Sequence, residues 1–169
     1  MLLLVLAGAV QGCATGPHPD VALAENRLQR VSTEMLGVIS SDRRITLTVF
    51  DSLELAAYSH SDGRIFVSSA LLNRLSDEEL AAAIAHELGH LINDGHLHTM
   101  AALSGGGARD NTEFAADQTA AQLLSASHQD PNALQTMLEK VAADPSLSDE
   151  NQKRIRNRIA RLAFPANHP

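Results

Sequence analysis

The segment His86-Glu87-Leu88-Gly89-His90 constrains this chain more than any other part of it. On a helix, residues four positions apart lie about 40° apart around the axis, so both imidazoles can reach one metal ion. Glu87 then stands beside that metal without having to bind it. Two neutral nitrogen ligands, an open coordination position for water and an adjacent base are what a zinc hydrolase requires. The segment therefore predicts a hydrolytic metal site.

The residues around this segment predict a helix from about residue 77 to about residue 94. Ser76 and Glu79 form a capping-box pattern at its start, and Gly95 is a candidate residue just beyond its end. The predicted core stripe of the helix consists of Leu80, Ile84, Leu88, Leu91 and Ile92. The alternative is that two histidines and a glutamate merely decorate an alanine-rich helix.

A second predicted helix, ending near Leu124, carries two more carboxylates. Glu113 and Asp117 are four residues apart, so one face presents both of them. One can be a third metal ligand, while the other accepts a hydrogen bond from the far nitrogen of a ligand histidine. The alternative is that Asp110 and Glu113 form a capping box and that Asp117 is solvated.

With these motifs in this order, the chain resembles the gluzincin metallopeptidases of the CAAX-prenyl-protease and HtpX type, which include the lipoproteins BepA and LoiP. The resemblance covers residues 46–124. It rests on the His86–His90 segment, on the E-x-x-A-D pattern from Glu113 to Asp117, and on residues 63–72, which read GRIFVSSALL.

The resemblance implies that His86, His90 and Glu113 bind one Zn²⁺ per chain and that Glu87 is the general base. Asp117 would be the hydrogen-bond partner of a ligand histidine, His86. The implied activity is zinc-dependent endoproteolysis of cell-envelope polypeptides, in particular unfolded or misassembled ones. Envelope-assembly proteins are further candidate partners.

Two segments depart from the family pattern. Where family members often have Asn-Ala-Phe-Ala, this chain has Ala56-Ala57-Tyr58-Ser59. Where they often have His-Pro-Ser followed by Arg, the counterpart is Asp144-Pro145-Ser146, and basic residues arrive late, at Lys153, Arg154 and Arg156. We assign no substrate role to this second segment.

The amino terminus predicts a bacterial lipoprotein. An apolar run of about ten residues is too short to span a bilayer but fits a secretory signal. Gly12-Cys13 is similar to a lipobox, and Ala14 implies sorting to the outer membrane. We therefore expect a signal peptide at residues 1–12, the lipidated Cys13 and a tether at residues 13–19, and one metallopeptidase domain at residues 20–169. The protein would face the periplasm.

The remaining pattern predicts an α+β fold, a minimal gluzincin with about five helices and a small antiparallel sheet beside the zinc helix. Helices are expected at residues 20–39, after Asp130-Pro131 and after Ser148, in addition to the two metal-binding helices. Strands are expected at residues 45–50, 53–58 and 64–68. The candidate edge strand for binding an extended substrate is Arg64, Ile65, Phe66 and Val67. A net charge of −7 without a basic stripe argues against nucleic acid as a partner.

A different functional class remains open at this stage. The chain could be a weakly active or inactive zinc-binding chaperone or assembly lipoprotein. A closed, structural zinc site would need a fourth ligand, for which His96 and His98 are the candidates. The glycine-rich stretch at residues 105–107 near the site is compatible with this alternative.

Overall fold

The structure is a computed structural model that describes residues 19–40, 44–94, 98–99 and 109–162. These residues form helices and short strands in the following order: α1 (Pro19–Gly37), β1 (Ile39–Ser40), β2 (Thr46–Phe50), β3 (Ala57–Ser59), β4 (Arg64–Ser68), α2 (Ser69–Arg74), α3 (Asp77–Asn93), β5 (His98–Thr99), α4 (Arg109–Ala126), α5 (Ala133–Ala142) and α6 (Asp149–Arg161). The predicted α+β class is confirmed. The described residues contain one helix more than expected, the short α2, which begins after Ser68, whose hydroxyl accepts a hydrogen bond from the Leu71 amide.

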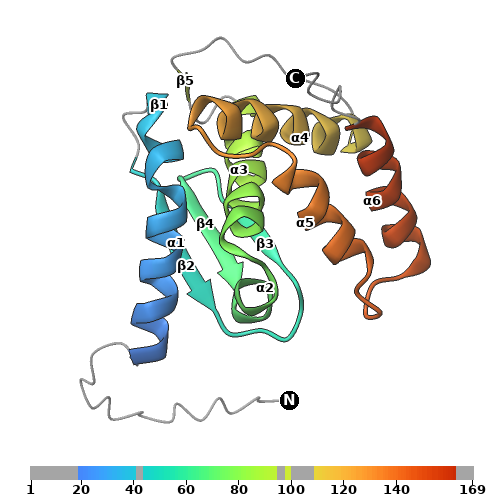
Figure 1. The fold of residues 1–169 in the computed structure, drawn as a ribbon, viewed down its shortest axis with the longest axis horizontal. Coiled ribbons are helices and arrows are strands. Elements are labelled where there is room, and N and C mark those ends of the chain that lie inside the picture. The colour runs from blue at the N-terminus through green and yellow to red at the C-terminus, as the bar shows by residue number, and fades with distance from the viewer. Residues whose placement is uncertain (1–18, 41–43, 95–97, 100–108, 163–169) are drawn as a thin grey trace, which may run out of the picture.

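The three-stranded sheet has the order β2-β4-β3 and is mixed (Figure 1). β3 pairs with β4 in the antiparallel sense, but β2 pairs with β4 in the parallel sense, so the predicted antiparallel sheet is wrong in this pairing. The chain reverses direction twice between β2 and β4, and β4 then inserts between its two predecessors. Alternating apolar residues predict the strands but do not determine which strands become neighbours.

The predicted substrate edge is therefore also wrong. Residues Arg64 to Val67 lie in β4, which has a partner strand on each side. Ile65 and Val67 are fully buried, as expected for the strand at the centre of the sheet. The exposed edges belong to β2 and β3. Gly63 sits in the turn that leads into β4, with the positive φ of 93° that a side chain rarely tolerates.

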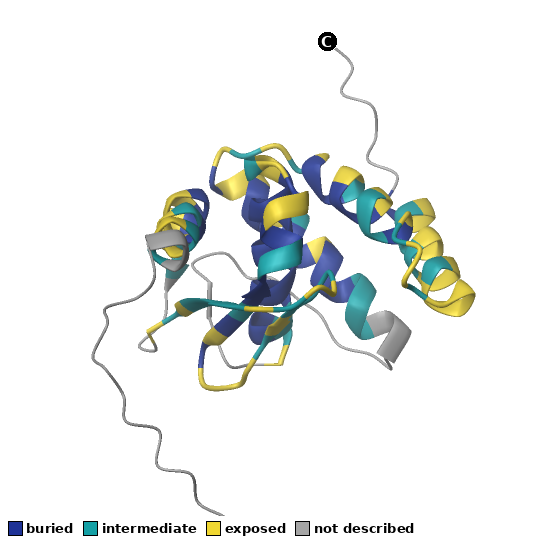
Figure 2. Cartoon of the chain, turned by 90° about the horizontal axis from the view of Figure 1, so that it is seen from below, coloured by how far each residue is buried: buried dark blue, intermediate teal, exposed yellow. Residues whose placement is uncertain are grey.

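Helix α3 lies in the middle of the molecule, with α1 on one flank and α6 on the other (Figure 1). The predicted capping box is confirmed. The Glu79 amide donates a hydrogen bond to the Ser76 hydroxyl, and the Ser76 amide donates one to the Glu79 carboxylate. That carboxylate also pairs with Lys140 of α5, with 2.6 Å between Nζ and Oε2. The five predicted stripe residues are buried, but so are their neighbours around the helix. Figure 2 shows that burial is concentrated in this central region, with exposed residues on α1 and α6.

Helices α3 and α4 approach each other closely at Gly89. A Cβ atom built on Gly89 would lie 2.6 Å from the main-chain oxygen of Ala116 and 3.0 Å from its Cα. These are backbone atoms and cannot turn aside as a side chain does. A residue without a side chain at position 89 is thus what allows the two helices that carry the predicted ligands to pack at this distance.

Several expectations fall on residues that the structure does not describe. The signal peptide, Cys13, most of the tether, Gly95, His96 and the glycine stretch at residues 105–107 lie outside the described residues, as does the side chain of His98. Among the described helices, none combines the length and apolar character needed to cross a membrane.

Gly89→Ala should lower the free energy of unfolding by about 1–3 kcal/mol, because the added methyl group overpacks a rigid contact. Helix propensity alone would give the opposite sign, since alanine favours a helix interior by about 1 kcal/mol over glycine. The control is Gly37→Ala in α1, where a Cβ would meet nothing within 4 Å. Urea denaturation measures both variants. Equal stabilities of Gly89→Ala and the parent protein would show that the close approach is not a constraint.

Candidate metal centre

Two helices bring the three predicted metal ligands together. His86 and His90 come from α3 and Glu113 from α4, and the two Nε2 atoms are 3.2 Å apart. Each Nε2 has one Glu113 oxygen at 3.4 Å. Within the described ranges, these residues form the one group of potential ligands whose donor atoms all lie within 4.8 Å of one another. The spacing of four residues within each motif thus brings side chains of both helices into one cluster.

The dimensions of this cluster suit a small tetrahedral cation. Zinc binds histidine nitrogen and carboxylate oxygen at about 2.0–2.2 Å, so two ligand atoms of a tetrahedral site are separated by about 3.3 Å. The observed separations of 3.2 and 3.4 Å are close to that edge length. The 3.4 Å distances go to different oxygens of Glu113, Oε2 for His86 and Oε1 for His90. Three protein donors would therefore leave a fourth position of a tetrahedral site for water or substrate.

Asp117 fixes the orientation of the His86 ring. Its Oδ1 is 2.9 Å from His86 Nδ1, and its side chain is fully buried, so the alternative of a solvated residue is wrong. An Nδ1–H that donates to Asp117 leaves the Nε2 lone pair directed at the cluster. Burial alone would raise the pKa of Asp117, but hydrogen bonds from Arg158 and His86 hold it below its usual value.

The other ionisable groups of the cluster respond to the same contacts. Burial tends to lower the pKa of His86, yet hydrogen bonds to Asp117 and Glu113 raise it to about 9. The hydrogen bond from His86 lowers the pKa of Glu113 to about 2. Burial and the charge of His86 lower the pKa of His90. In the absence of metal the cluster therefore holds a proton on His86, and a metal ion must displace it to bind.

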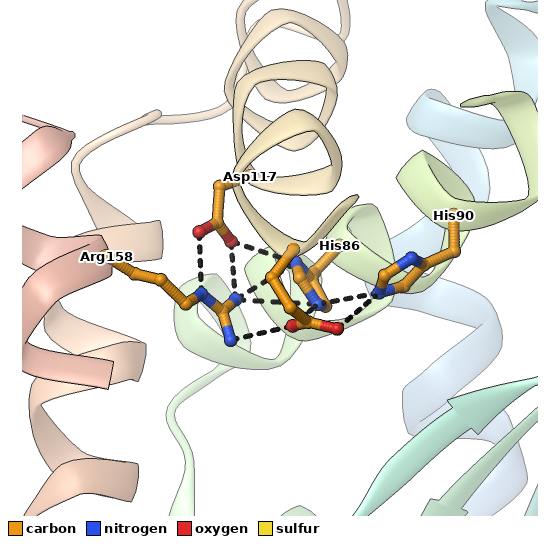
Figure 3. A network of polar contacts seen from close by, with 5 residues as sticks. His86, His90, Asp117 and Arg158 are labelled. Atoms are coloured by element: carbon orange, nitrogen blue, oxygen red, sulfur yellow. Dashed lines mark hydrogen bonds and ion pairs between the residues drawn. The ribbon is translucent and has the colours of Figure 1, made fainter. Parts of the chain in front are cut away.

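The fourth charged group of the site, Arg158 of α6, was not predicted from the sequence. Its guanidinium donates two hydrogen bonds to Asp117, from Nε at 2.8 Å and from Nη2 at 2.6 Å (Figure 3). Its Nη1 lies 2.9 Å from Glu113 Oε2. One side chain thereby holds both carboxylates of α4 in a fixed relative position.

A sequence signal for Arg158 exists in hindsight. It follows Ile155 by three residues and precedes the buried Leu162 by four, so it lies on the inward face of α6. The basic residues that the family pattern suggested do not reach the site. Arg154 pairs with Glu150 on the same helix, and Arg156 donates to Gln152. Asp144-Pro145-Ser146 forms a turn before α6, in which Asp144 accepts a hydrogen bond from the Ser146 amide.

The charges of the site favour a divalent cation. Three carboxylates, those of Glu87, Glu113 and Asp117, stand close to one guanidinium, that of Arg158. With both imidazoles neutral, a doubly charged ion would balance the excess negative charge. An uncompensated charge in a buried position is costly, so a bound cation would stabilise this group of carboxylates.

The cluster opens into a pocket of about 560 Å³. Glu87, buried and adjacent in sequence to His86, lines this pocket together with His86, His90 and Glu113. Residues 55–59, which include the whole of β3, also line the pocket. A water molecule or a peptide in the pocket would therefore meet the metal ligands, the Glu87 carboxylate and a strand edge.

Arg158→Gln should reduce the free energy of unfolding of the metal-free protein by about 3–5 kcal/mol, because it breaks a buried ion pair and leaves the Asp117 carboxylate with His86 as its remaining charged partner. Arg154→Gln on the outer face of the same helix is the control, and should cost less than about 1 kcal/mol. Chemical denaturation in the presence of a chelator measures both. A small, equal effect of the two substitutions would contradict the bracing role of Arg158.

The sequence model of peptidase family M48 matches residues 22–109, which include the His86–His90 segment and end before Glu113. No curated protein matches the chain. The matched part extends from α1 to the start of α4 and thus contains the sheet and the whole of α3. Because the match covers more than half of the chain and includes the helix that carries His86 and His90, this protein belongs to peptidase family M48, a family of metallopeptidases.

Proposed function

We propose that this protein is a zinc-dependent metalloendopeptidase. The observation that carries the proposal is the triangle of donor atoms from His86, His90 and Glu113, which lies beside the buried Glu87 in an open pocket. Two imidazoles and one carboxylate are a ligand set of catalytic zinc sites, in which the fourth position holds water. The CAAX-protease, HtpX or BepA-LoiP subtype is part of the proposal and rests on the sequence motifs.

Each side chain of the site then has a defined task. Zinc, when bound, would supply a water molecule of lowered pKa and would polarise the substrate carbonyl. Glu87 accepts the proton of the attacking water and passes it to the nitrogen of the leaving amine as the C–N bond breaks. Asp117 keeps the Nε2 atom of His86 available for the metal, and Arg158 keeps Asp117 and Glu113 in place.

The polypeptide substrate would bind to the edge of β3. In this strand, the Ala56 carbonyl accepts a hydrogen bond from the Ser68 amide, and the His60 amide donates to the Arg64 carbonyl, each at 2.8 Å. Main-chain groups of an antiparallel strand alternate in direction, so those of Ala57 and Ser59 point away from β4. An extended substrate that pairs with these groups would lie along the pocket and would need to be unfolded locally.

The physiological setting is a proposal from the sequence. Cys13 as a lipidated residue would hold the enzyme at the periplasmic face of the outer membrane, where unfolded or misassembled envelope proteins are its substrates. Recognition through a strand edge supports this class of substrate, because a folded protein rarely offers extended backbone.

Glu87→Gln should bind zinc as the parent protein does but cleave an unfolded model protein more slowly by orders of magnitude, because it removes the base and keeps the ligands. The His86→Ala, His90→Ala double variant is the control for the metal and should lose stoichiometric zinc. Zinc is measured by elemental analysis and cleavage by mass spectrometry. Equal cleavage by Glu87→Gln and the parent would refute the peptidase mechanism, and stoichiometric zinc in the double variant would refute the ligand assignment.

Cys13→Ser should move the protein from the membrane fraction to the soluble periplasmic fraction, because attached fatty chains would be its main membrane contact. Fractionation of cells that express each form tests this. A Cys13→Ser protein that still sediments with membranes at high salt would rule out the lipid anchor.

A further inference from the structure

An aromatic row lies on the outer face of the sheet beside the pocket. Three of the five aromatic residues of the chain, Phe50, Tyr58 and Phe66, contact one another there. The rings of Tyr58 and Phe66 are stacked with centroids 4.9 Å apart, and those of Phe50 and Tyr58 are tilted with centroids 5.6 Å apart. The opposite face of β4 carries the fully buried Ile65 and Val67. The row is thus on the face that is turned away from the core.

Tyr58 contacts both other rings of the row and lies on the edge strand. Tyr58 pairs directly with Phe66 of β4, while the other edge of β3 has no partner strand among the described residues. The ring of Tyr58 is covered on one side by Phe66, yet the residue remains 49% exposed. In a chain with so few aromatic residues, a half-exposed ring at the edge of the pocket is not required by the core.

The pairing geometry places one substrate residue directly beside this ring. Ala57 and Ser59 offer their main-chain groups to a strand added at the β3 edge, so Tyr58 would occupy a non-hydrogen-bonded position of that new antiparallel pair. At such positions the two Cα atoms are only about 4.5 Å apart, and both side chains project from the same face. The substrate residue opposite Tyr58 would therefore project on the side of the aromatic row.

We infer that Tyr58 is a specificity-determining residue that favours an aromatic or large aliphatic side chain at the substrate position opposite it. This inference rests on the proposed function and adds the substrate class. The substrate ring or alkyl group would pack against the part of Tyr58 that Phe50 and Phe66 leave exposed. Aromatic cross-strand pairs are worth enough to give about a 2- to 10-fold preference over alanine. Such side chains occur at alternate positions in unfolded segments that form buried strands in the folded protein.

The test uses extended peptides that differ at a single position, which is Phe, Leu, Ala or Asp, with that position moved stepwise along the peptide. Binding is measured by fluorescence anisotropy to zinc-loaded Glu87→Gln protein, which separates recognition from cleavage. The variants are Tyr58→Thr, which keeps a strand-favouring residue but removes the ring, and Tyr58→Phe, which keeps the ring. The control is Leu53→Thr, because Leu53 is 98% exposed and does not line the pocket.

We expect the Tyr58-containing protein to bind the Phe or Leu peptide about 2- to 10-fold more tightly than the Ala peptide at one position. Tyr58→Thr should lose this preference at that position alone, while Tyr58→Phe and Leu53→Thr should retain it. No preference at any position, an unchanged preference in Tyr58→Thr, or an equal loss of affinity for every peptide would overturn the inference. A failure of the proposed function would be seen in a different assay, in which the parent protein and Glu87→Gln would cleave a substrate equally well.

Discussion

The buried carboxylate of Asp117 connects the three helices that build the site. It contacts His86 of α3 at 2.9 Å and Arg158 of α6 at 2.6 Å, while α4 supplies it. Each of these contacts joins opposite partial or full charges away from solvent, where an unmatched charge would be strongly unfavourable. One side chain thus links the orientation of the His86 imidazole to the position of Arg158 on α6, and Arg158 in turn contacts Glu113. Asp117 is therefore a structural requirement of the site.

The rest of the fold holds α3, which carries His86, beside the edge of β3. α3 is buried on most sides, by α4 at Gly89, by α5 through the Glu79–Lys140 pair and by the sheet. Such burial fixes the helix, and His86, Glu87 and His90 line the pocket bordered by β3. A rigid donor set next to a strand edge that no other described strand pairs with is an arrangement suited to hydrolysing an extended chain.

Local sequence patterns predicted those features that depend on local spacing. The i, i+4 histidines, the i, i+4 carboxylates and the capping box at Ser76 follow from helix geometry, and the structure places them as expected. Of the interactions that cross between elements, the contacts of Glu113 and Asp117 with the histidines were expected from the family resemblance. The strand order and the role of Arg158 were predicted wrongly or missed. The parallel pairing of β2 with β4 and the central position of β4 depend on strand order, which alternation does not encode. Arg158 was overlooked because its partners lie more than forty residues away in the sequence. Its place on the apolar face of α6 was the available signal.

The most direct measurement is anomalous X-ray diffraction at the zinc absorption edge from crystals of the zinc-loaded protein. The account predicts one peak about 2.0–2.2 Å from His86 Nε2, His90 Nε2 and a Glu113 oxygen, with no fourth protein side chain bound. A peak at any other group of residues would contradict the site. A fourth bond from His96 or His98 would contradict the catalytic assignment, since it would close the position that water must occupy.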